Sequence, residues 1–249
     1  MNLFSQILYV ADTAVQCLLL VLLLRRGFRK CGVFLLYALG EFASDVCEGM
    51  VYYRSGWETP FYRKLYWTDH MTLELLLLLV VISFAYRALH GNPHRSKSTK
   101  AIAIILAVTL ILPFATLHNH YSKTYGFFTS RWFQHTIQVW SFGAAIMNLV
   151  LWTALLTSRR RDVQLVILSI GAGLATSSAA IVWGGRQWLP QTGRWPLDDF
   201  LTVAHLATLL VWCWAFRPKT AARAGSATPW SGADPPGNNP YPDGLRSPS

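Results

Sequence analysis

The feature that most constrains this chain is a series of seven apolar runs, each about 20 to 26 residues long. They cover residues 3–24, 33–53, 65–89, 101–121, 132–157, 163–185 and 197–216. A helix of about 20 residues is long enough to cross the ~30 Å hydrocarbon core of a bilayer. Only 14% of the residues are charged, fewer than the roughly 25% that soluble domains carry. The sequence therefore predicts an all-α, polytopic membrane protein whose residues 1–216 form a seven-transmembrane helix bundle.

The distribution of basic residues predicts the orientation of this bundle. Fifteen of the 22 Lys and Arg residues follow the first, third, fifth and seventh runs, and seven lie in the segments at the other end. Because positively charged segments stay on the cytoplasmic side, the N-terminus is predicted outside and the C-terminus in the cytoplasm. This topology accounts for the net charge of +10. We therefore expect the bilayer, and no nucleic acid, as the partner of the basic residues.

The composition changes after the seventh run. Residues 217–249 contain seven of the twelve prolines, and they cannot bury enough apolar area to offset the entropy of ordering. We expect a disordered cytoplasmic tail. Within the bundle, the small residues Gly171, Ala172 and Gly173 predict a point where two helices pack closely. The four cysteines have no metal-knuckle spacing and are expected as free thiols.

Acidic residues inside the apolar runs carry the functional signal. Eight of the twelve lie within a run or at its edge, namely Asp12, Glu41, Asp45, Glu48, Asp69, Glu74, Asp198 and Asp199. A charged side chain at the bilayer centre costs about 2.5 to 3.5 kcal/mol on insertion scales, so such residues face a bundle interior or a wet cavity. No Lys or Arg lies in the core of any run. The carboxyl groups must therefore be protonated, pair with imidazolium, or bind a cation.

Helical spacing places these groups on stripes. Glu41, Asp45 and Glu48 share one face of the second run because they are separated by four and three residues. The other stripes are Asp12 with Gln16, Tyr66 with His70 and Glu74, Arg131 with His135 and Gln138, and Asp198 with Thr202 and His205. Asp12, Asp45, Glu74 and His205 fall near the midplane. The predicted binding residues of an outward-facing cavity are Asp12, Asp45, Glu48, Glu74, His70, His205, Asp198 and Glu41.

Three readings follow from this cavity. The first is binding or sensing of a small ligand, a cation or protons. The second is an intramembrane zinc or other metal-dependent hydrolase, whose candidate ligands are His70, Glu74, His118, His120, His135 and His205. The third is a coupled transporter, a partner subunit of a membrane complex, or a homo-oligomer.

Several known seven-helix classes are excluded by missing residues. A retinal-binding opsin needs a lysine in the last helix, and residues 197–216 contain none, so no retinal is expected. The Ser-x-x-x-His signature of ceramidase-like intramembrane hydrolases is absent, and the one His-x-x-x-His spacing, His90 to His94, lies in the segment between two apolar runs. The sequence also lacks the Asn-Pro-x-x-Tyr motif of G-protein-coupled receptors in its last run.

One segment carries a resemblance. The pattern Phe61-Tyr62-Arg63-Lys64-Leu65-Tyr66-Trp67, followed by Glu74 and closed by Tyr86-Arg87, resembles that of uncharacterised bacterial multispanning membrane proteins. The resemblance implies multi-pass insertion in a bacterial cytoplasmic (inner) membrane. It implies no activity.

Overall fold

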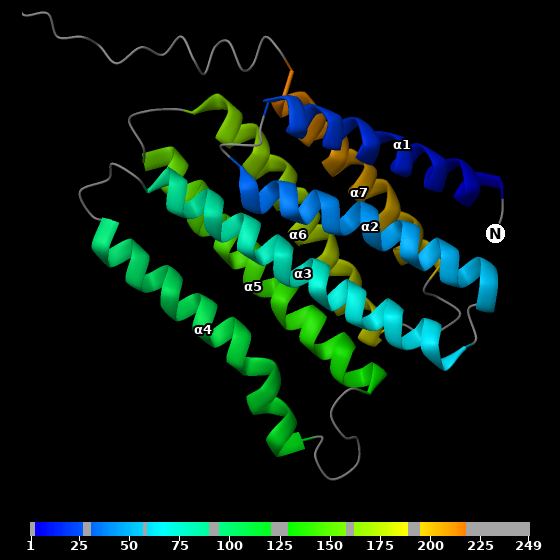
Figure 1. Ribbon diagram of the computed structural model, residues 1–249. Helices are drawn as coiled ribbons and strands as arrows, with labels where there is room; N and C mark the ends of the chain where they lie inside the picture. The colour runs from blue at the N-terminus through cyan, green and yellow to red at the C-terminus, as the bar shows by residue number, and fades with distance from the viewer. Residues whose placement is uncertain are drawn as a thin grey trace, which may run out of the picture.

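The computed structural model describes residues 3–26, 31–56, 59–89, 95–120, 129–157, 162–188 and 195–217, and every regular element in them is an α-helix. The seven helices are α1 (Leu3–Arg26), α2 (Gly32–Ser55), α3 (Pro60–Ala88), α4 (Arg95–His120), α5 (Ser130–Thr157), α6 (Val163–Trp188) and α7 (Trp195–Ala215). Each predicted apolar run coincides with one helix to within a few residues (Figure 1). The expected all-α class is confirmed, and the predicted tail lies outside the described residues.

In the described part of the chain, four helices are long and apolar enough to cross a membrane: α1, α3, α5 and α6. The apolar stretches of α4 and α7 are shorter, covering Thr99–Ala115 and Asp199–Ala215. α2 carries three carboxyl groups along its length, which lowers its hydropathy. The molecule thus has the helices of a membrane protein, while the seven-span count and the sides of the termini stay predictions.

Two helices begin at well-formed caps. The Thr59 side chain accepts a hydrogen bond from the Tyr62 backbone N–H at 3.3 Å, and Pro60 fills the first helical position of α3. At the start of α6, Asp162 Oδ1 accepts from the Leu165 N–H at 3.2 Å. α3 begins five residues before the predicted apolar run, because its cap lets the helix start within the polar segment that precedes that run.

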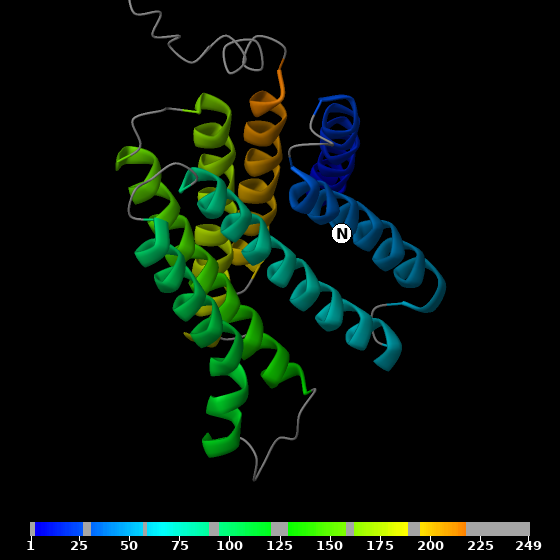
Figure 2. The ribbon, with the colours of Figure 1, turned by 60° about the vertical axis from the view of Figure 1, so that its left-hand side comes forward.

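Five of the helices form a closed ring. α1 packs on α2, α2 on α3, α3 on α6, α6 on α7, and α7 returns to α1. α5 packs against α3 and α6 outside this ring, and α4 packs against α5 at the edge of the bundle (Figures 1 and 2). Consecutive helices run in opposite directions, so the connections gather alternately at the two ends. This ring of five helices surrounds the cavity that is described in the next subsection.

One half of the ring is filled by a dense aromatic and aliphatic core, which we call the core half. It contains the C-terminal parts of α1, α3 and α7 and the N-terminal parts of α2 and α6. Trp212 is fully buried at its centre and meets the Phe34 ring edge-on, with centroids 4.8 Å apart. Its indole N–H donates to the Leu168 carbonyl at 3.1 Å, so the polar atom of this large side chain is satisfied.

Small residues let this core close. A Cβ on Gly171 would collide with the Trp212 indole, and one on Gly173 would press on the Asn148 amide. The predicted close packing at residues 171–173 is therefore confirmed, with Gly171 facing α7 and Gly173 facing α5. All four cysteines are free, as expected.

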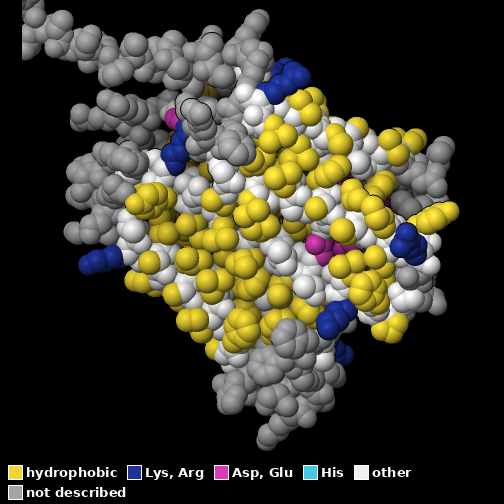
Figure 3. Space-filling model, in the orientation of Figure 1, with side chains coloured by type: hydrophobic (Ala, Val, Ile, Leu, Met, Phe, Trp, Pro, Cys, Tyr) yellow, Lys and Arg dark blue, Asp and Glu magenta, His cyan; other side chains and the backbone are white. Residues whose placement is uncertain are grey.

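The outer surface is apolar over its middle. Figure 3 shows hydrophobic side chains across the centre of one face, with Lys and Arg near its margins. Large exposed side chains occur on all seven helices, among them Val10, Leu36, Leu79, Ile111 and Leu149. A contiguous apolar surface of this kind is what lipid contact requires.

Candidate functional site

The half of the ring opposite the core encloses a cavity of about 470 Å³, and we call this part the cavity half. All five ring helices line it. Its polar lining residues are Tyr9, Asp12, Gln16, Tyr37, Glu41, Asp45, His70, Glu74, Ser178, Asp199, Thr202 and His205. Their spacing of three or four residues within each helix places them on one face of it, as the stripes predict. Six of the eight predicted binding residues therefore line one cavity.

Gln16 joins the acidic groups of α1 and α2. Its side-chain N–H₂ group donates to Asp12 Oδ2 at 3.0 Å and to Asp45 Oδ2 at 2.6 Å. Gln16 and Asp12 are buried, and Asp45 is partly buried. Two carboxyl groups from different helices thus share one amide group as donor.

His205 of α7 completes the cluster from the other side. Its Nε2 lies 3.6 Å from Asp12 Oδ1 and 3.5 Å from Glu41 Oε1, which places one imidazole between carboxyl groups of α1 and α2. The Tyr37 hydroxyl donates to the same Glu41 oxygen at 2.7 Å. Asp12, Glu41, Asp45, Gln16 and His205 therefore form one connected group, which we call the acidic cluster. Its helices α1, α2 and α7 make up the acidic wall of the cavity.

The facing wall, formed by α3 and α6, is mainly apolar. It presents Leu73, Leu77, Ala175, Ala179 and Trp183 to the cavity. The polar groups on this wall are His70, Glu74 and Ser178. A cavity with a cluster of carboxyl groups on one wall and mainly apolar side chains on the other is suited to a ligand that is polar at one end.

His70 is held by aromatic contacts. Its ring lies edge-on to the Tyr66 ring, with centroids 4.2 Å apart, and 6.0 Å from the Trp183 ring. The Arg186 guanidinium stacks over Trp183 at 4.3 Å from the ring centroid. The positive charge of Arg186 is therefore stacked on Trp183, an aromatic side chain that lines the cavity. Among the residues that the structure describes, no Lys or Arg lines the cavity itself.

Three buried acceptor atoms in the cavity half have no hydrogen-bond partner. They are Asp12 Oδ1, Gln16 Oε1 and Glu74 Oε2. Gln16 is only 3% exposed and Asp12 only 8% exposed. A buried polar atom without a partner is costly, at about 1–3 kcal/mol. These atoms mark positions where a donor from a bound molecule or water would be stabilised.

Two predicted binding residues are not among the residues that line the cavity. Glu48 turns from it toward α3, where its carboxyl group is hydrogen-bonded to that of Asp69. The Ser44 hydroxyl also donates to Asp69. Glu48 lies seven residues, nearly two full turns, beyond Glu41 on α2. The side chain of Asp198 lies outside the described part, and its neighbour Asp199 lines the cavity mouth.

The expected polar stripe of α5 does not belong to the cavity. α5 packs behind α3 and α6, so Arg131, His135 and Gln138 do not line it. α5 reaches the site indirectly, because the Ser141 hydroxyl is hydrogen-bonded to Glu74. Spacing within one helix predicts which residues share a face but not the position of that helix in the bundle.

The metal hypothesis receives no support from the described residues. No three His, Cys, Asp or Glu side chains among them are arranged to hold a metal ion. His70 and His205 belong to opposite walls, and His135 lies outside the ring. The side chains of His118 and His120 are outside the described part of the chain.

Sequence reasoning missed several lining residues. Tyr37 stands four residues before Glu41 and extends its stripe, so the same spacing would have found it. Tyr9 donates to the Asp45 backbone carbonyl at 3.5 Å and so links α1 to α2 beside the cavity. Ala175 and Ser178 carry no titratable signal, and nothing in the sequence marked α6 as a wall.

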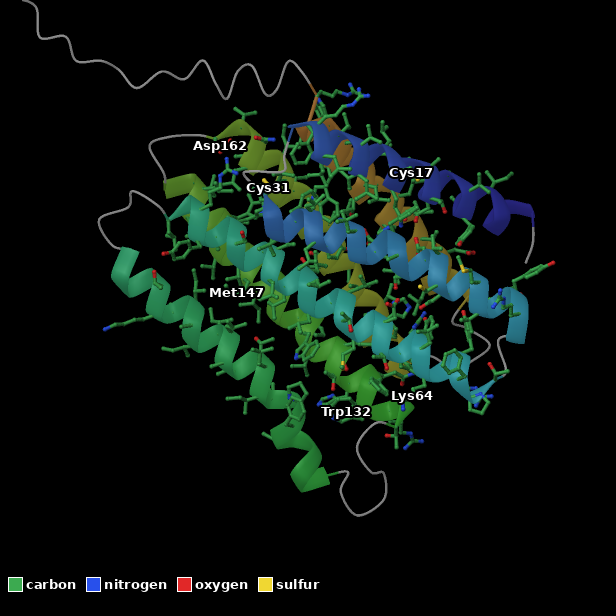
Figure 4. The ribbon with its side chains drawn as sticks, viewed as in Figure 1. Cys17, Cys31, Lys64, Trp132, Met147 and Asp162 are labelled. Atoms are coloured by element: carbon green, nitrogen blue, oxygen red, sulfur yellow. The ribbon has the colours of Figure 1, made fainter. Side chains whose placement is uncertain are left out.

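A second polar contact lies at the opposite end of the bundle. Arg87 of α3 pairs with Asp162 at the start of α6 at 2.8 Å. The Arg87 guanidinium also lies 3.7 Å from the Cys31 thiol at the start of α2. Figure 4 shows Cys31 and Asp162 at this end and Lys64 and Trp132 at the other. This contact ties three helices of the core half together.

Protein-family models, curated proteins and solved structures offer no match to this chain. The class of this protein is therefore described from its fold and its candidate site alone. It is a helical bundle of membrane-protein composition with a cavity that holds carboxyl groups and histidine.

Proposed function

We propose that this chain is an integral membrane protein of seven spans, with its N-terminus outside, that binds or senses a small ligand, a cation or protons in the cavity. One observation carries the proposal. The carboxyl groups of Asp12 and Glu41, from two helices, lie within 3.6 Å of a single imidazole of a third helix, and Asp45 joins them through Gln16, next to a cavity of about 470 Å³.

The charge of the acidic cluster supports a positively charged partner. The acidic cluster holds three carboxyl groups and one histidine, and even a protonated His205 carries only one positive charge. In a site of low dielectric constant, an excess of negative charge is relieved by a proton or a bound cation. The size of the cavity falls within the ~300–1,000 Å³ typical of small-molecule sites.

The position of the cavity supports access from outside. Its mouth is formed by the N-terminal parts of α1 and α7, where Tyr9 is 46% exposed and Asp199 is exposed. In the proposed topology, these ends face the exterior because the basic segments lie at the opposite end of the bundle. The core half closes the cavity on the cytoplasmic side.

The test uses the full chain purified in nanodiscs. Its melting temperature is measured from about pH 5 to pH 8, where histidine changes charge, and with small cations added at constant ionic strength. A ligand at about 100 times its Kd stabilises by about 2.7 kcal/mol, which raises the melting temperature of a chain of this size by roughly 5–10 °C. We expect the parent chain to respond to pH or to a cation.

The variants Asp12→Asn, Asp45→Asn, Glu74→Gln and His205→Gln each remove one titratable group of the cavity, and we expect each to weaken that response. Asp162→Asn, at the opposite end of the bundle, serves as the matched acidic control and keeps the response. Equal responses of the parent and all four cavity variants would refute the proposal.

A further inference from the structure

The residues that line the cavity favour one class of positively charged ligand over others. We propose that the cavity binds a small amphipathic amine in its protonated primary or secondary form, with its N–H groups on Asp12, Gln16 and Asp45 and its apolar part against α3 and α6. This inference rests on the proposed function and names the ligand class of the same site.

The first argument is the set of acceptors that the protein leaves unsatisfied. Gln16 uses its N–H₂ group for Asp12 and Asp45, so its carbonyl oxygen Oε1 stays without a donor inside the protein. Asp12 Oδ1 also accepts no hydrogen bond, although His205 Nε2 lies 3.6 Å away. Both residues are more than nine-tenths buried. The site therefore offers buried acceptors that only N–H or O–H donors can satisfy.

The second argument is the charge of these acceptors. An ammonium group supplies both the missing donors and the missing positive charge, and hydrogen bonds between charged groups are roughly twice as strong as neutral ones. A quaternary ammonium has the charge but no N–H, so it would leave Gln16 Oε1 unsatisfied. A neutral alcohol has a donor but leaves the negative charge of the cluster uncompensated.

The third argument is the remaining space. A water molecule occupies about 30 Å³ of liquid volume, so a bare cation fills only a small part of a cavity of about 470 Å³. The rest faces mainly Leu73, Leu77, Ala175, Ala179 and Trp183, with His70, Glu74 and Ser178 as the polar side chains of that wall. Apolar groups of a ligand are stabilised there by the area that they remove from water. The ligand is therefore expected to be polar at one end only.

The direction of binding follows from the two walls. The ammonium end approaches α1 and α2 at Gln16, while the apolar body lies toward Ala175 and Ala179 of α6, whose small side chains leave room. His205 stays between Asp12 and Glu41, so the carboxyl group of Glu41, the deeper of the two, is already paired with the imidazole. Asp45, which receives one donor from Gln16, takes the ionic contact with the ligand.

The experiment compares three probes of one shape on the full chain in nanodiscs. They are 2-phenylethylamine, its N,N,N-trimethyl analogue and 2-phenylethanol, and their affinities are measured by calorimetry. We expect the amine to bind about tenfold or more tightly than either of the others, because each charged hydrogen bond lost costs about that factor.

Two variants locate the contact. Gln16→Met keeps the length of the side chain but removes Oε1, and it is expected to reduce the preference for the amine over its trimethyl analogue. Asp45→Asn is expected to weaken both cations and to leave the alcohol unchanged. Asp162→Asn is the control and keeps all three affinities. The melting temperature of each variant reports whether it is folded, and Asp45→Asn replaces Gln16→Met if the latter is not.

The outcomes separate the two proposals. If the trimethyl analogue binds as tightly as the amine, recognition through N–H groups is overturned, while cation binding stands. If no probe binds but the parent still responds to pH or inorganic cations, the ligand class is overturned and the proposed function stands. If the alcohol binds as tightly as both cations and Asp45→Asn changes nothing, recognition of a charged amine is overturned, while binding of a small ligand stands. If no probe binds and the parent responds to neither pH nor inorganic cations, both proposals are overturned.

Discussion

The two halves of the helix ring are built from the same five helices but filled in opposite ways. The core half is packed with aromatic and aliphatic side chains around Trp212, whose N–H is satisfied by the Leu168 carbonyl. The cavity half holds open space, a cluster of carboxyl groups and three buried acceptors without partners. The difference separates stability from the proposed binding: one half stabilises the arrangement of helices that encloses the cavity of the other half.

Tyr37 marks the boundary between the halves. Its ring meets Trp212 edge-on at a centroid distance of 5.8 Å, and its hydroxyl donates to Glu41. One side chain therefore belongs to the core through its ring and to the acidic cluster through its oxygen. Because a packed core transmits displacement, a shift of Glu41 on ligand binding would be felt at Trp212.

The largest effect is expected in the core half. Trp212→Ala removes a fully buried side chain and should lower the free energy of unfolding by about 3–5 kcal/mol, since a cavity is left behind. Chemical denaturation in mild detergent measures this loss. Trp212→Phe keeps most of the ring and should lose far less. Equal costs for the two variants would show that packing at this position is not what stabilises the bundle.

A moderate effect is expected at the end of the core half. Asp162 caps α6 and pairs with Arg87, and the two side chains are 32% and 33% exposed. Asp162→Ala should therefore cost about 1–2 kcal/mol, of which the cap contributes about 1 and the partly exposed ion pair less. Arg87→Met removes only the ion pair and should cost less, as measured by the same denaturation. A greater cost for Arg87→Met would contradict the capping role.

The smallest effect on stability is expected in the cavity half. Ala175→Leu extends a side chain into open space and should change the free energy of unfolding by less than about 1 kcal/mol, while abolishing probe binding. Ser177→Leu, on the exposed side of the same helix, is the matched control and should keep binding. A large loss of stability in Ala175→Leu with binding retained would remove the contrast between the halves.

Much of this fold could be predicted from the sequence. Hydropathy located all seven helices, because each carries a long apolar run bounded by polar or basic residues. Helical spacing then placed Asp12, Glu41, Asp45, Glu74 and His205 on inward faces, and these residues line one cavity.

The rest depended on how the helices are arranged, which spacing within one helix does not contain. His135 was grouped with the site, but α5 lies behind α3 and α6. Glu48 shares a helical face with Asp45, yet its carboxyl group lies beside Asp69 of α3 and not in the cavity. The sequence did not predict α6 as a wall of the cavity, because Ala175 and Ser178 are small and carry no charge.

The ring closes where α7 returns to α1, and this contact joins residues almost 200 positions apart, as between Val15 and Cys213, which are 198 apart. During biosynthesis, Asp12 and Glu41 leave the ribosome long before His205. The carboxyl groups of Asp12 and Glu41 are therefore made long before the imidazole that they contact. The acidic cluster can form only after α7 has been synthesised, because His205 is its last member along the chain.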